Sequence, residues 1–346
     1  MDLKLYLSDY SRDADNFIKT YFADKRKRAA KIDPLAVKVL TTLENFLYGG
    51  KKVRGALTVL GYRMAGGKNV KDILPVSVAL EIMHSSLLIH DDFIDHDDFR
   101  RGKPTVHRIY AKGQSEHFGA SIAVIIGDVG IFLSNQILAD SSFDSDLITN
   151  AFNKYEELLI NTGYGEILDI VFDKKKNITW NDILKVRKYK TAHYTFVMPL
   201  TVGAVLAAAE EKTLINIKKY GEPVGIGFQI RDDILGIYGD PDVTGKSNES
   251  DIKEGKKTFL LIKALEMADK ENNSYLGKWY GSAELKTKEI NKIREIIKNC
   301  GAYDYSQKLA LDLATEGKKY VSQITIRKEY QNILNDFADF VVTRDK

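Results

Sequence analysis

The sequence predicts an all-α fold, a large helical bundle made of one domain that spans residues 1–346. Apolar residues recur at three- and four-residue spacing along most of the chain, which is typical of helices. Alternation of β-branched residues is nearly absent, and there are six prolines. Glycine, asparagine and aspartate mark the turns instead, as at Gly49-Gly50 and Gly66-Gly67. We therefore expect roughly ten to twelve helices and no convincing strand.

Composition indicates a globular chain and argues against several function classes. Hydrophobic residues make up 44% and charged residues 29% of 346 residues, which is enough apolar mass for a large core. The net charge of +3 gives no strong attraction to nucleic acid, so we expect no nucleic-acid partner. Cys300 is the single cysteine; it cannot form an internal disulfide, which fits a reducing compartment.

No segment of the sequence predicts a membrane span. The N-terminus lacks an apolar signal region. The most apolar runs, Ser121 to Leu133 and Thr195 to Ala209, are shorter than the ~20 residues that cross a bilayer. We expect both to be buried core helices, and we expect a cytoplasmic protein.

One expected helix, from Ile73 to about Asp95, joins an apolar body to an acidic end. It is apolar on nearly every side, which predicts a place at the centre of the bundle. Its end carries Asp91, Asp92 and Asp95, of which the first and last share one helix face. Such close carboxylates repel one another unless a cation binds them. Oxygen ligands suit Mg²⁺, which also keeps waters and phosphate oxygens.

A second acidic cluster, Phe228-Gln229-Ile230-Arg231-Asp232-Asp233, strengthens this interpretation. Gln229, Asp232 and Asp233 share a face of another expected helix. Two such helices in one bundle can hold a group of Mg²⁺ ions that binds a diphosphate and takes up its charge as it leaves.

Cations suited to phosphate stand close to these clusters in the sequence. Arg100 and Arg101 follow the first cluster directly, and arginine favours bidentate phosphate contacts. Lys51 and Arg54 follow the Gly49-Gly50 pair at the start of an expected helix, where an anion site can form. Further cations are Lys190, Lys246 and Lys256. Together they predict two phosphate sites around one metal cluster.

The motifs that run from Gly49 to Lys257 resemble those of the trans-polyprenyl diphosphate synthases, which include farnesyl and geranylgeranyl diphosphate synthases. The matching segments are Gly-Gly-Lys-Lys-x-Arg at 49–54, Leu-Ile-His-Asp-Asp-x-x-Asp at 88–95, Arg-Arg-Gly-Lys-Pro-Thr-Val-His at 100–107, Gly-Asp at 127–128, Lys-Thr-Ala-His-Tyr at 190–194, Phe-Gln-Ile-Arg-Asp-Asp at 228–233 and Gly-Lys at 245–246. The resemblance implies a bundle of the isoprenoid synthase type with a central active-site cavity, and a homodimer.

The resemblance also implies roles for individual residues. Mg²⁺, with three ions per active site when substrate is bound, would be held by Asp91, Asp95 and Asp232, with Asp92 and Asp233 beside them. Isopentenyl diphosphate would be bound by Lys51, Arg54, His84 and Arg101. The allylic diphosphate would be bound by Arg100, Lys190, Thr191, Gln229, Lys246 and Lys256. Thr191 and Gln229 would lie near the developing allylic cation, and the catalytic set is Asp91, Asp232, Lys190, Thr191 and Gln229.

Two positions depart from the family pattern. Gly236 stands where the second motif often ends in aspartate, although Asp240 lies one turn further on. Glu166, in Gly165-Glu166-x-x-Asp169, replaces a usual glutamine and adds a charge near the expected site.

The expected reaction is ionisation of an allylic diphosphate, attack by the double bond of isopentenyl diphosphate, and loss of a proton. The product chain would lie in an apolar tunnel beside the helix above Asp91, and one turn of helix rises about 5.4 Å, close to one isoprene unit. The tunnel residues expected on this helix are Leu80, Met83, Ser86 and Leu87. Ser86 is small, so no aromatic floor is expected there, and we predict a twenty-carbon product.

Other functions remain open at this point. The product can have fifteen carbons, or twenty-five or more. A terpene cyclase also uses an Asp-Asp-x-x-Asp motif, but it needs no isopentenyl diphosphate site. A non-catalytic subunit of a heteromeric synthase would be expected to lose acidic clusters that are present here.

Overall fold

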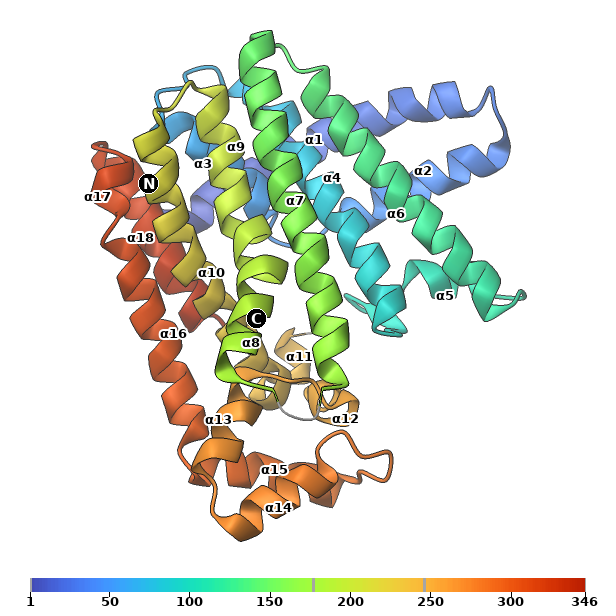
Figure 1. Cartoon of the computed structure of the whole chain (residues 1–346). Helices are drawn as coiled ribbons and strands as arrows, with labels where there is room; N and C mark the ends of the chain where they lie inside the picture. The colour runs from blue at the N-terminus through green and yellow to red at the C-terminus, as the bar shows by residue number, and fades with distance from the viewer. Residues whose placement is uncertain (1, 176–177, 245–246, 346) are drawn as a thin grey trace. The chain divides into compact units, whose positions relative to one another are not determined.

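The computed structural model describes residues 2–175, 178–244 and 247–345, which are almost entirely helical (Figure 1). Contacts between Cα atoms divide the chain into two compact units. The first unit contains Met1–Tyr155 and Pro199–Leu214, and the second contains Glu156–Met198 and Ile215–Lys346. The prediction of an all-α fold is confirmed.

The first unit holds the N-terminal helices and a short hairpin. Its elements are α1 (Leu3–Ala29), α2 (Pro34–Leu47), α3 (Val53–Met64), α4 (Val70–Ile94), β1 (Phe99–Arg100), β2 (Lys103–Pro104), α5 (Val106–Ala111), α6 (Glu116–Ala139), the start of α7 (Ser145–Asp173) and most of α9 (Met198–Leu206). Helix α4 packs against α1, α2, α3, α5 and α6. It is therefore the core helix of this unit, as its apolar sequence predicts.

The second unit holds the end of α7 and most of the C-terminal helices. Its other elements are α8 (Trp180–Val186), the π-helix η1 (Arg187–Val197), α10 (Glu211–Tyr238), α11 (Pro241–Thr244), α12 (Ser250–Glu254), α13 (Phe259–Met267), α14 (Lys270–Trp279), α15 (Thr287–Asn299), α16 (Ala302–Lys318), α17 (Val321–Ile324) and α18 (Lys328–Thr343). The helices of the described residues outnumber those expected, partly because α11, α12 and α17 have only four or five residues.

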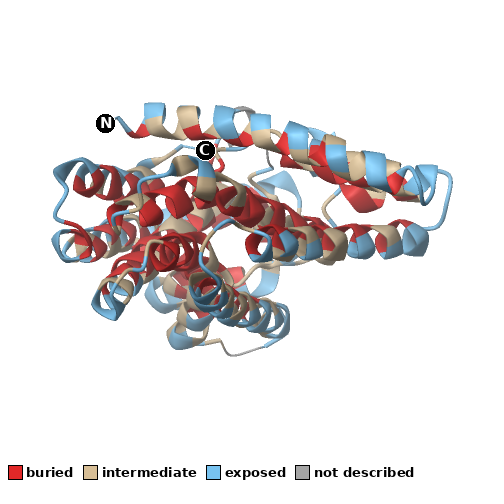
Figure 2. Cartoon of the chain, turned by 90° about the horizontal axis from the view of Figure 1, so that it is seen from above, coloured by how far each residue is buried: buried red, intermediate tan, exposed pale blue. Residues whose placement is uncertain are grey.

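Local sequence signals explain where many of these helices begin. The side chains of Asp33, Asn69 and Thr258 accept hydrogen bonds from first-turn amides of α2, α4 and α13. These residue types satisfy amides that have no partner within the helix. Several long helices bury one side and expose the other, as Figure 2 shows for α1.

The hairpin of β1 and β2 is a feature that the sequence reading missed. Phe99 pairs with Pro104 and Arg100 with Lys103 in antiparallel register. Arg101 and Gly102 form the turn with φ of 52° and 72°, the left-handed conformation of tight hairpin turns. Strands of two residues leave no alternating pattern, so the expectation of no convincing strand was wrong at this place.

The two most apolar runs differ in burial. Within the run from Thr195 to Ala209, residues 195–206 lie in η1 and α9 and are buried as expected, whereas residues 207–209 follow α9 and are partly or fully exposed. The run from Ser121 to Leu133 lies in α6. Only 39% of the most apolar 18-residue segment of this helix is buried, so the expectation of a buried core helix was wrong for this run. Among the described residues, α4 and α6 are long and apolar enough to span a bilayer by length and composition, and the corresponding segment of α4 is 67% buried.

Candidate active site

The first aspartate cluster lies at the C-terminal end of α4. Asp91 and Asp95 are half-buried, and the amide of Asp95 donates to the carbonyl of Asp91 over 2.8 Å. Carboxylates at this end of a helix face the negative pole of its dipole, which disfavours their charge. A cation beside them would remove that cost. The donors are all carboxylate oxygens, which fit Mg²⁺.

Asp92 differs from its two neighbours because it is fully buried. Its Oδ1 accepts a hydrogen bond from Nε of Arg100 at 2.5 Å, and Nη2 of the same guanidinium lies 2.5 Å from this oxygen in an ion pair. Nη2 of Arg100 also lies 3.7 Å from Asp97. The structure therefore places Asp92 as the buried partner of Arg100, while Asp91 and Asp95 remain on the half-buried side of the helix end.

Beside this cluster the first unit gathers the cations expected to bind isopentenyl diphosphate. Burial and the nearby charges of Arg54, Arg101 and Arg100 hold the pKa of His84 well below its ordinary value, so its imidazole is neutral at physiological pH. Gly50 has a φ of 76°, which favours glycine, and a Cβ there would lie 2.8 Å from Nη2 of Arg101, so the guanidinium packs closely against this turn. Lys51 is half-buried and lies just before α3.

The start of α3 is held by protein carboxylates. Oε1 of Glu81 accepts from the amide of Gly55 at 2.7 Å, and burial raises the pKa of Glu81. Nζ of Lys52 lies 2.9 Å from Asp15 of α1. Since Glu81 takes up a first-turn amide of α3, a diphosphate at this place would depend on the side chains of Lys51 and Arg54 more than on the helix end. The sequence reading did not single out Glu81.

The expected tunnel residues of α4 differ in how deeply they are buried. Leu80, Met83 and Ser86 are completely buried, whereas Leu87 is half-buried. The hydroxyl of Ser86 donates to the carbonyl of Ile82 at 2.9 Å. A Cβ at Gly130 of α6 would lie 2.0 Å from Oγ of Ser86. Ser86 is therefore small because α4 and α6 cross closely here.

In the second unit, η1 positions Lys190 and Thr191. Nζ of Lys190 lies 2.6 Å from Asp169 and 2.9 Å from Glu166, both on α7. Burial alone would raise the pKa of Asp169, but Lys190 and Arg187 hold it below its ordinary value. The glutamate that departs from the family pattern therefore serves as a partner of Lys190. A long π-helix is rare and often marks a functional site.

The second aspartate cluster on α10 is organised around Asp233. This carboxylate is buried, lies 3.2 Å from Arg187 and accepts from Nε2 of Gln229 at 3.1 Å. Burial raises its pKa to about 6. The hydroxyl of Thr191 donates to Oε1 of Gln229 at 3.0 Å. The structure thus brings Thr191 and Gln229 together and shows Asp233 as a buried partner of Arg187.

Asp232, next along the chain, remains half-exposed and forms an ion pair with Arg344. On α12, Asp251 lies beside Gly236, and Nζ of Lys256 lies 3.1 Å from Glu254 and 3.9 Å from Asp251. Lys246, which was expected to bind the allylic diphosphate, lies outside the described residues.

The carboxylates of each unit fit a metal ion whose other coordination positions are filled by molecules from outside the protein. Within residues 2–175, 178–244 and 247–345, no group of three or more Asp, Glu, His or Cys side chains is placed to hold a metal by itself. Mg²⁺ usually takes one or two carboxylates and completes its octahedron with waters and phosphate oxygens. The half-buried pair Asp91 and Asp95 suits that mode.

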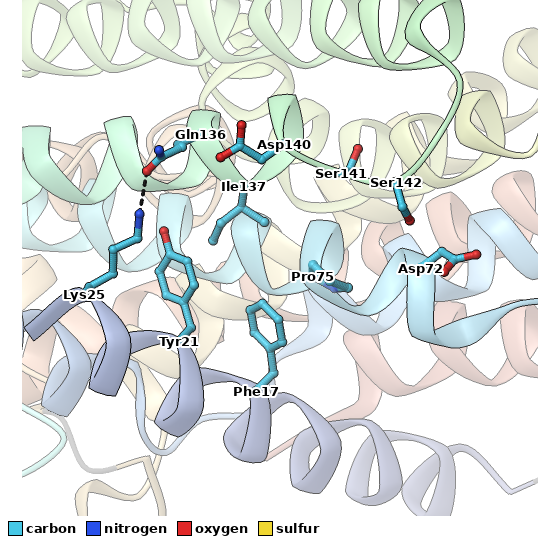
Figure 3. A pocket seen from close by; sticks show the side chains of 10 residues that line it. All are labelled: Phe17, Tyr21, Lys25, Asp72, Pro75, Gln136, Ile137, Asp140, Ser141 and Ser142. Carbon is cyan, nitrogen blue, oxygen red and sulfur yellow. Dashed lines mark hydrogen bonds between the residues drawn. The ribbon is translucent and has the colours of Figure 1, made fainter. Parts of the chain in front are cut away.

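A separate cavity of about 320 Å³ lies in the first unit, at the other end of α4 (Figure 3). Phe17 and Tyr21 of α1 and Ile137 of α6 give it an apolar wall, and Nζ of Lys25 donates to Gln136 at 2.6 Å beside it. Its α4 residues are Asp72 and Pro75, which lie about 28 Å and about 24 Å along the helix from Asp91. It is therefore distinct from the acidic cluster.

Several residues of the site carried no signal in the sequence reading. Asp169, Arg187 and Arg344 pair with expected site residues that lie 21, 46 and 112 positions away in the sequence. Asp251 lies beside Gly236, on another helix. The pattern Gly165-Glu166-x-x-Asp169 was the one signal that pointed to any of them.

Comparison with known proteins agrees with the geometry. A sequence model described as polyprenyl synthetase matches residues 37–297, which is more than half of the chain. A geranylgeranyl diphosphate synthase of Methanosarcina mazei is 30% identical over 86% of this chain and 86% of its own length. A geranylfarnesyl diphosphate synthase of Aeropyrum pernix is 32% identical over 86% of this chain and 91% of its own.

A solved structure is similar over nearly the whole chain. It is geranylgeranyl pyrophosphate synthase from Corynebacterium glutamicum in complex with isoprenyl diphosphate and magnesium. It is 28% identical, covers 99% of this chain and 100% of its own, and has a TM-score of 0.91. The helical fold and these relatives define an enzyme of the trans-prenyltransferase class. The chain belongs to the polyprenyl synthetase family.

Proposed function

We propose that this protein condenses isopentenyl diphosphate with an allylic diphosphate, head to tail and all-trans, and releases geranylgeranyl diphosphate. The observation that carries the proposal is the arrangement at the end of α4. Arg100 binds Asp92 and leaves Asp91 and Asp95 on the half-buried side. The charges of Arg54, Arg101 and Arg100 all lower the pKa of His84, so the acidic cluster and the expected isopentenyl diphosphate residues lie in the same part of the first unit. Metal-bound and cation-bound diphosphates can thus lie side by side.

Asp91 and Asp95 in the first unit, and Asp232 in the second, would hold the divalent ions, with three Mg²⁺ ions when substrate is bound. Bound Mg²⁺ supplies positive charge that stabilises a departing diphosphate. Lys51, Arg54 and Arg101 would hold isopentenyl diphosphate by charge. Neutral His84 would hold it by a hydrogen bond.

Thr191 and Gln229 are suited to stabilise an allylic cation. The Nε2 of Gln229 is engaged by Asp233, and its Oε1 accepts from Thr191. This fixes the amide so that its oxygen, the negative end of the dipole, lies beside the hydroxyl oxygen of Thr191. Two oriented oxygen dipoles offer stabilisation without a nucleophile that would trap the cation. Lys190, Arg100, Lys246 and Lys256 would bind the allylic diphosphate.

The length of the product follows from the relatives and from α4. Relatives named geranylgeranyl diphosphate synthase support twenty carbons. Leu87, the half-buried residue one turn above Asp91, would face the growing chain. A medium-sized aliphatic side chain there leaves room beyond fifteen carbons. The geranylfarnesyl synthase among the relatives makes twenty-five carbons the first alternative to test.

We further propose that the protein is a homodimer of the cytoplasm. Phe118, Ile125 and Phe132 recur every seven residues on α6 and are exposed, Phe132 by 67%. An exposed apolar stripe of this kind marks an association surface. A single half-buried thiol, Cys300, fits a reducing compartment. Sedimentation of the wild type and of Phe132→Glu tests the dimer, which the charge should dissociate.

The central test is an assay with Mg²⁺, isopentenyl diphosphate and each of dimethylallyl, geranyl and farnesyl diphosphate, with products read by mass spectrometry. We expect elongated all-trans products ending at twenty carbons. Asp91→Asn should lower the rate at least about 100-fold. Asp72→Asn on the same helix should not. Cyclic products would favour a cyclase, and no product from any primer would favour a non-catalytic subunit.

A further inference from the structure

Two residues that follow α18 contact the second aspartate motif. Arg344 follows α18, and its Nη2 forms an ion pair with Oδ1 of Asp232. The same guanidinium lies 4.1 Å from the centre of the Phe228 ring, one turn earlier on α10. An arginine that both pairs with a carboxylate and stacks on an aromatic ring is well fixed in place.

A second set of contacts holds the backbone of the tail. Nε of Arg231 donates to the carbonyl of Arg344 at 2.8 Å, and its Nη2 donates to Asp345 at 3.3 Å. The amide of Arg344 donates to the carbonyl of Phe340 at 3.0 Å and extends the end of α18. Residues 344 and 345 therefore bind three residues of the motif Phe228-Gln229-Ile230-Arg231-Asp232.

We propose that Arg344 is the counter-ion of Asp232 in the metal-free enzyme, and that binding of a divalent ion at Asp232 releases the Arg344 side chain. This inference rests on the proposed role of Asp232 as a metal ligand. The ion and the guanidinium would share one carboxylate, whose Oδ1 the guanidinium already contacts, and two cations at one carboxylate repel each other, so they compete. Metal binding and release of the tail are then one coupled event.

The exposure of the two partners allows the exchange. The Asp232 side chain is 39% exposed, whereas that of Arg344 is 12% exposed and lies on Phe228. A divalent ion can reach the carboxylate from solvent, and its double charge attracts the carboxylate more strongly than one guanidinium does. Asp233 cannot take part in the same exchange because it is buried against Arg187. Arg344 is thus a positioning residue that holds the Asp232 side chain in place before metal arrives.

The test uses the full-length protein with Mn²⁺ as the probe ion and saturating inorganic pyrophosphate. Isothermal titration calorimetry gives the number of bound ions and their affinity for the wild type, Arg344→Gln, Arg344→Lys and Asp232→Asn. Arg327→Gln, at the start of the same helix, is the matched control because it removes an equal charge about 26 Å away along α18. Hydrogen exchange of residues 341–345 reports release of the tail.

We expect Arg344→Gln to bind the most weakly held ion about five-fold more tightly, because the partly exposed ion pair no longer competes. Arg344→Lys should stay within about two-fold of the wild type, since a cation remains. Arg327→Gln should be unchanged. In the wild type, Mn²⁺ with pyrophosphate should speed exchange in residues 341–345. Circular dichroism of each variant verifies folding. If residues 344 and 345 served only packing, Arg344→Gln would speed exchange in residues 341–345 without binding the metal ion more tightly.

Two results would overturn the inference in different ways. If Asp232→Asn loses one ion while Arg344→Gln binds as weakly as the wild type, the competition is wrong and the proposed function stands. If Asp232→Asn binds as many ions as the wild type, Asp232 is no ligand, and both the coupling and its metal role in the proposed function fail.

Discussion

The carboxylate of Asp251 fills the space beside Gly236. A Cβ at position 236 would lie 2.1 Å from Oδ2 and 2.9 Å from Cγ of Asp251. Position 236 is where the family motif often ends in aspartate, so α12 brings a carboxylate to the place where α10 lacks one. An aspartate at 236 and the present position of Asp251 exclude each other.

Gly236→Asp should therefore destabilise the protein, although it restores the family pattern in the sequence. Overpacking of this kind costs about 1–3 kcal/mol, and two facing carboxylates add repulsion. The double variant Gly236→Asp/Asp251→Gly should recover most of the loss. Thermal unfolding of both single variants and the double variant measures the coupling. An equal loss in Gly236→Asp and in the double variant would contradict the steric explanation.

Glu166→Gln should strengthen binding of the allylic diphosphate. Lys190 lies 2.9 Å from Glu166 and 2.6 Å from Asp169, so the variant removes one of two carboxylates that compete for its charge. We expect KM for the allylic substrate to fall about two- to five-fold, the size of a partly exposed ion pair, with kcat little changed. Glu157→Gln on the same helix is the control. A higher KM would mean that Glu166 positions Lys190 rather than competing for it.

Arg187→Leu should be among the most destabilising substitutions in the second unit. Arg187 and Asp233 are both buried and paired at 3.2 Å, so the variant leaves a buried carboxylate without its cation. We expect a loss of about 3–5 kcal/mol in the free energy of unfolding, measured by urea denaturation. Lys185→Leu, on the exposed surface of α8, should change it little. Equal losses at the two positions would refute the role of the buried pair.

The stability of the protein should fall as the pH drops below about 6.5, in part because of His84. Burial and the charges of Arg54, Arg101 and Arg100 hold the folded-state pKa of His84 well below that of the unfolded chain. In this window the unfolded state binds a proton and the folded state does not, which costs up to about 1.4 kcal/mol per pH unit.

Urea denaturation of the wild type and His84→Gln at pH 7.5 and 5.5 isolates this effect. The pKa of His107 is also lowered, but His107 is present in both proteins, so it cancels in the difference. The wild type should lose at least about 1 kcal/mol more than the variant over this interval. Parallel losses would show that His84 titrates normally.

Leu87 and Ser86 should respond differently to a bulky substitution. Leu87 is half-buried, so Leu87→Phe should fold and shorten the product by about one isoprene unit, since one helix turn rises about 5.4 Å. Ser86 is completely buried where α4 crosses Gly130, so Ser86→Phe should unfold or lose stability instead. Mass spectrometry of products and thermal unfolding separate the two results. A stable Ser86→Phe enzyme with shorter products would place Ser86 in the tunnel.

Much of the candidate site was predictable because its residues lie close together in the sequence. Asp91 and Asp95 share a face through the repeat of the helix, and Arg100 and Arg101 follow within one hairpin. The family motifs led us to expect both Thr191 and Gln229 near the developing allylic cation. The structure places their side chains in direct contact. Their exact partners were not predictable, because Arg187, Asp169 and Arg344 come from other helices.

The sequence by itself determined the helical class, the core helix α4 and the acidic and basic motifs, because helix periodicity and charge spacing are local properties. Only the tertiary structure decided which charges are already paired. Asp92 and Asp233 are buried against Arg100 and Arg187, while Asp91, Asp95 and Asp232 remain accessible in part. Neighbouring aspartates in one motif thus differ in burial and pairing, because the cost of burying a charge depends on a partner that folding brings from elsewhere in the chain.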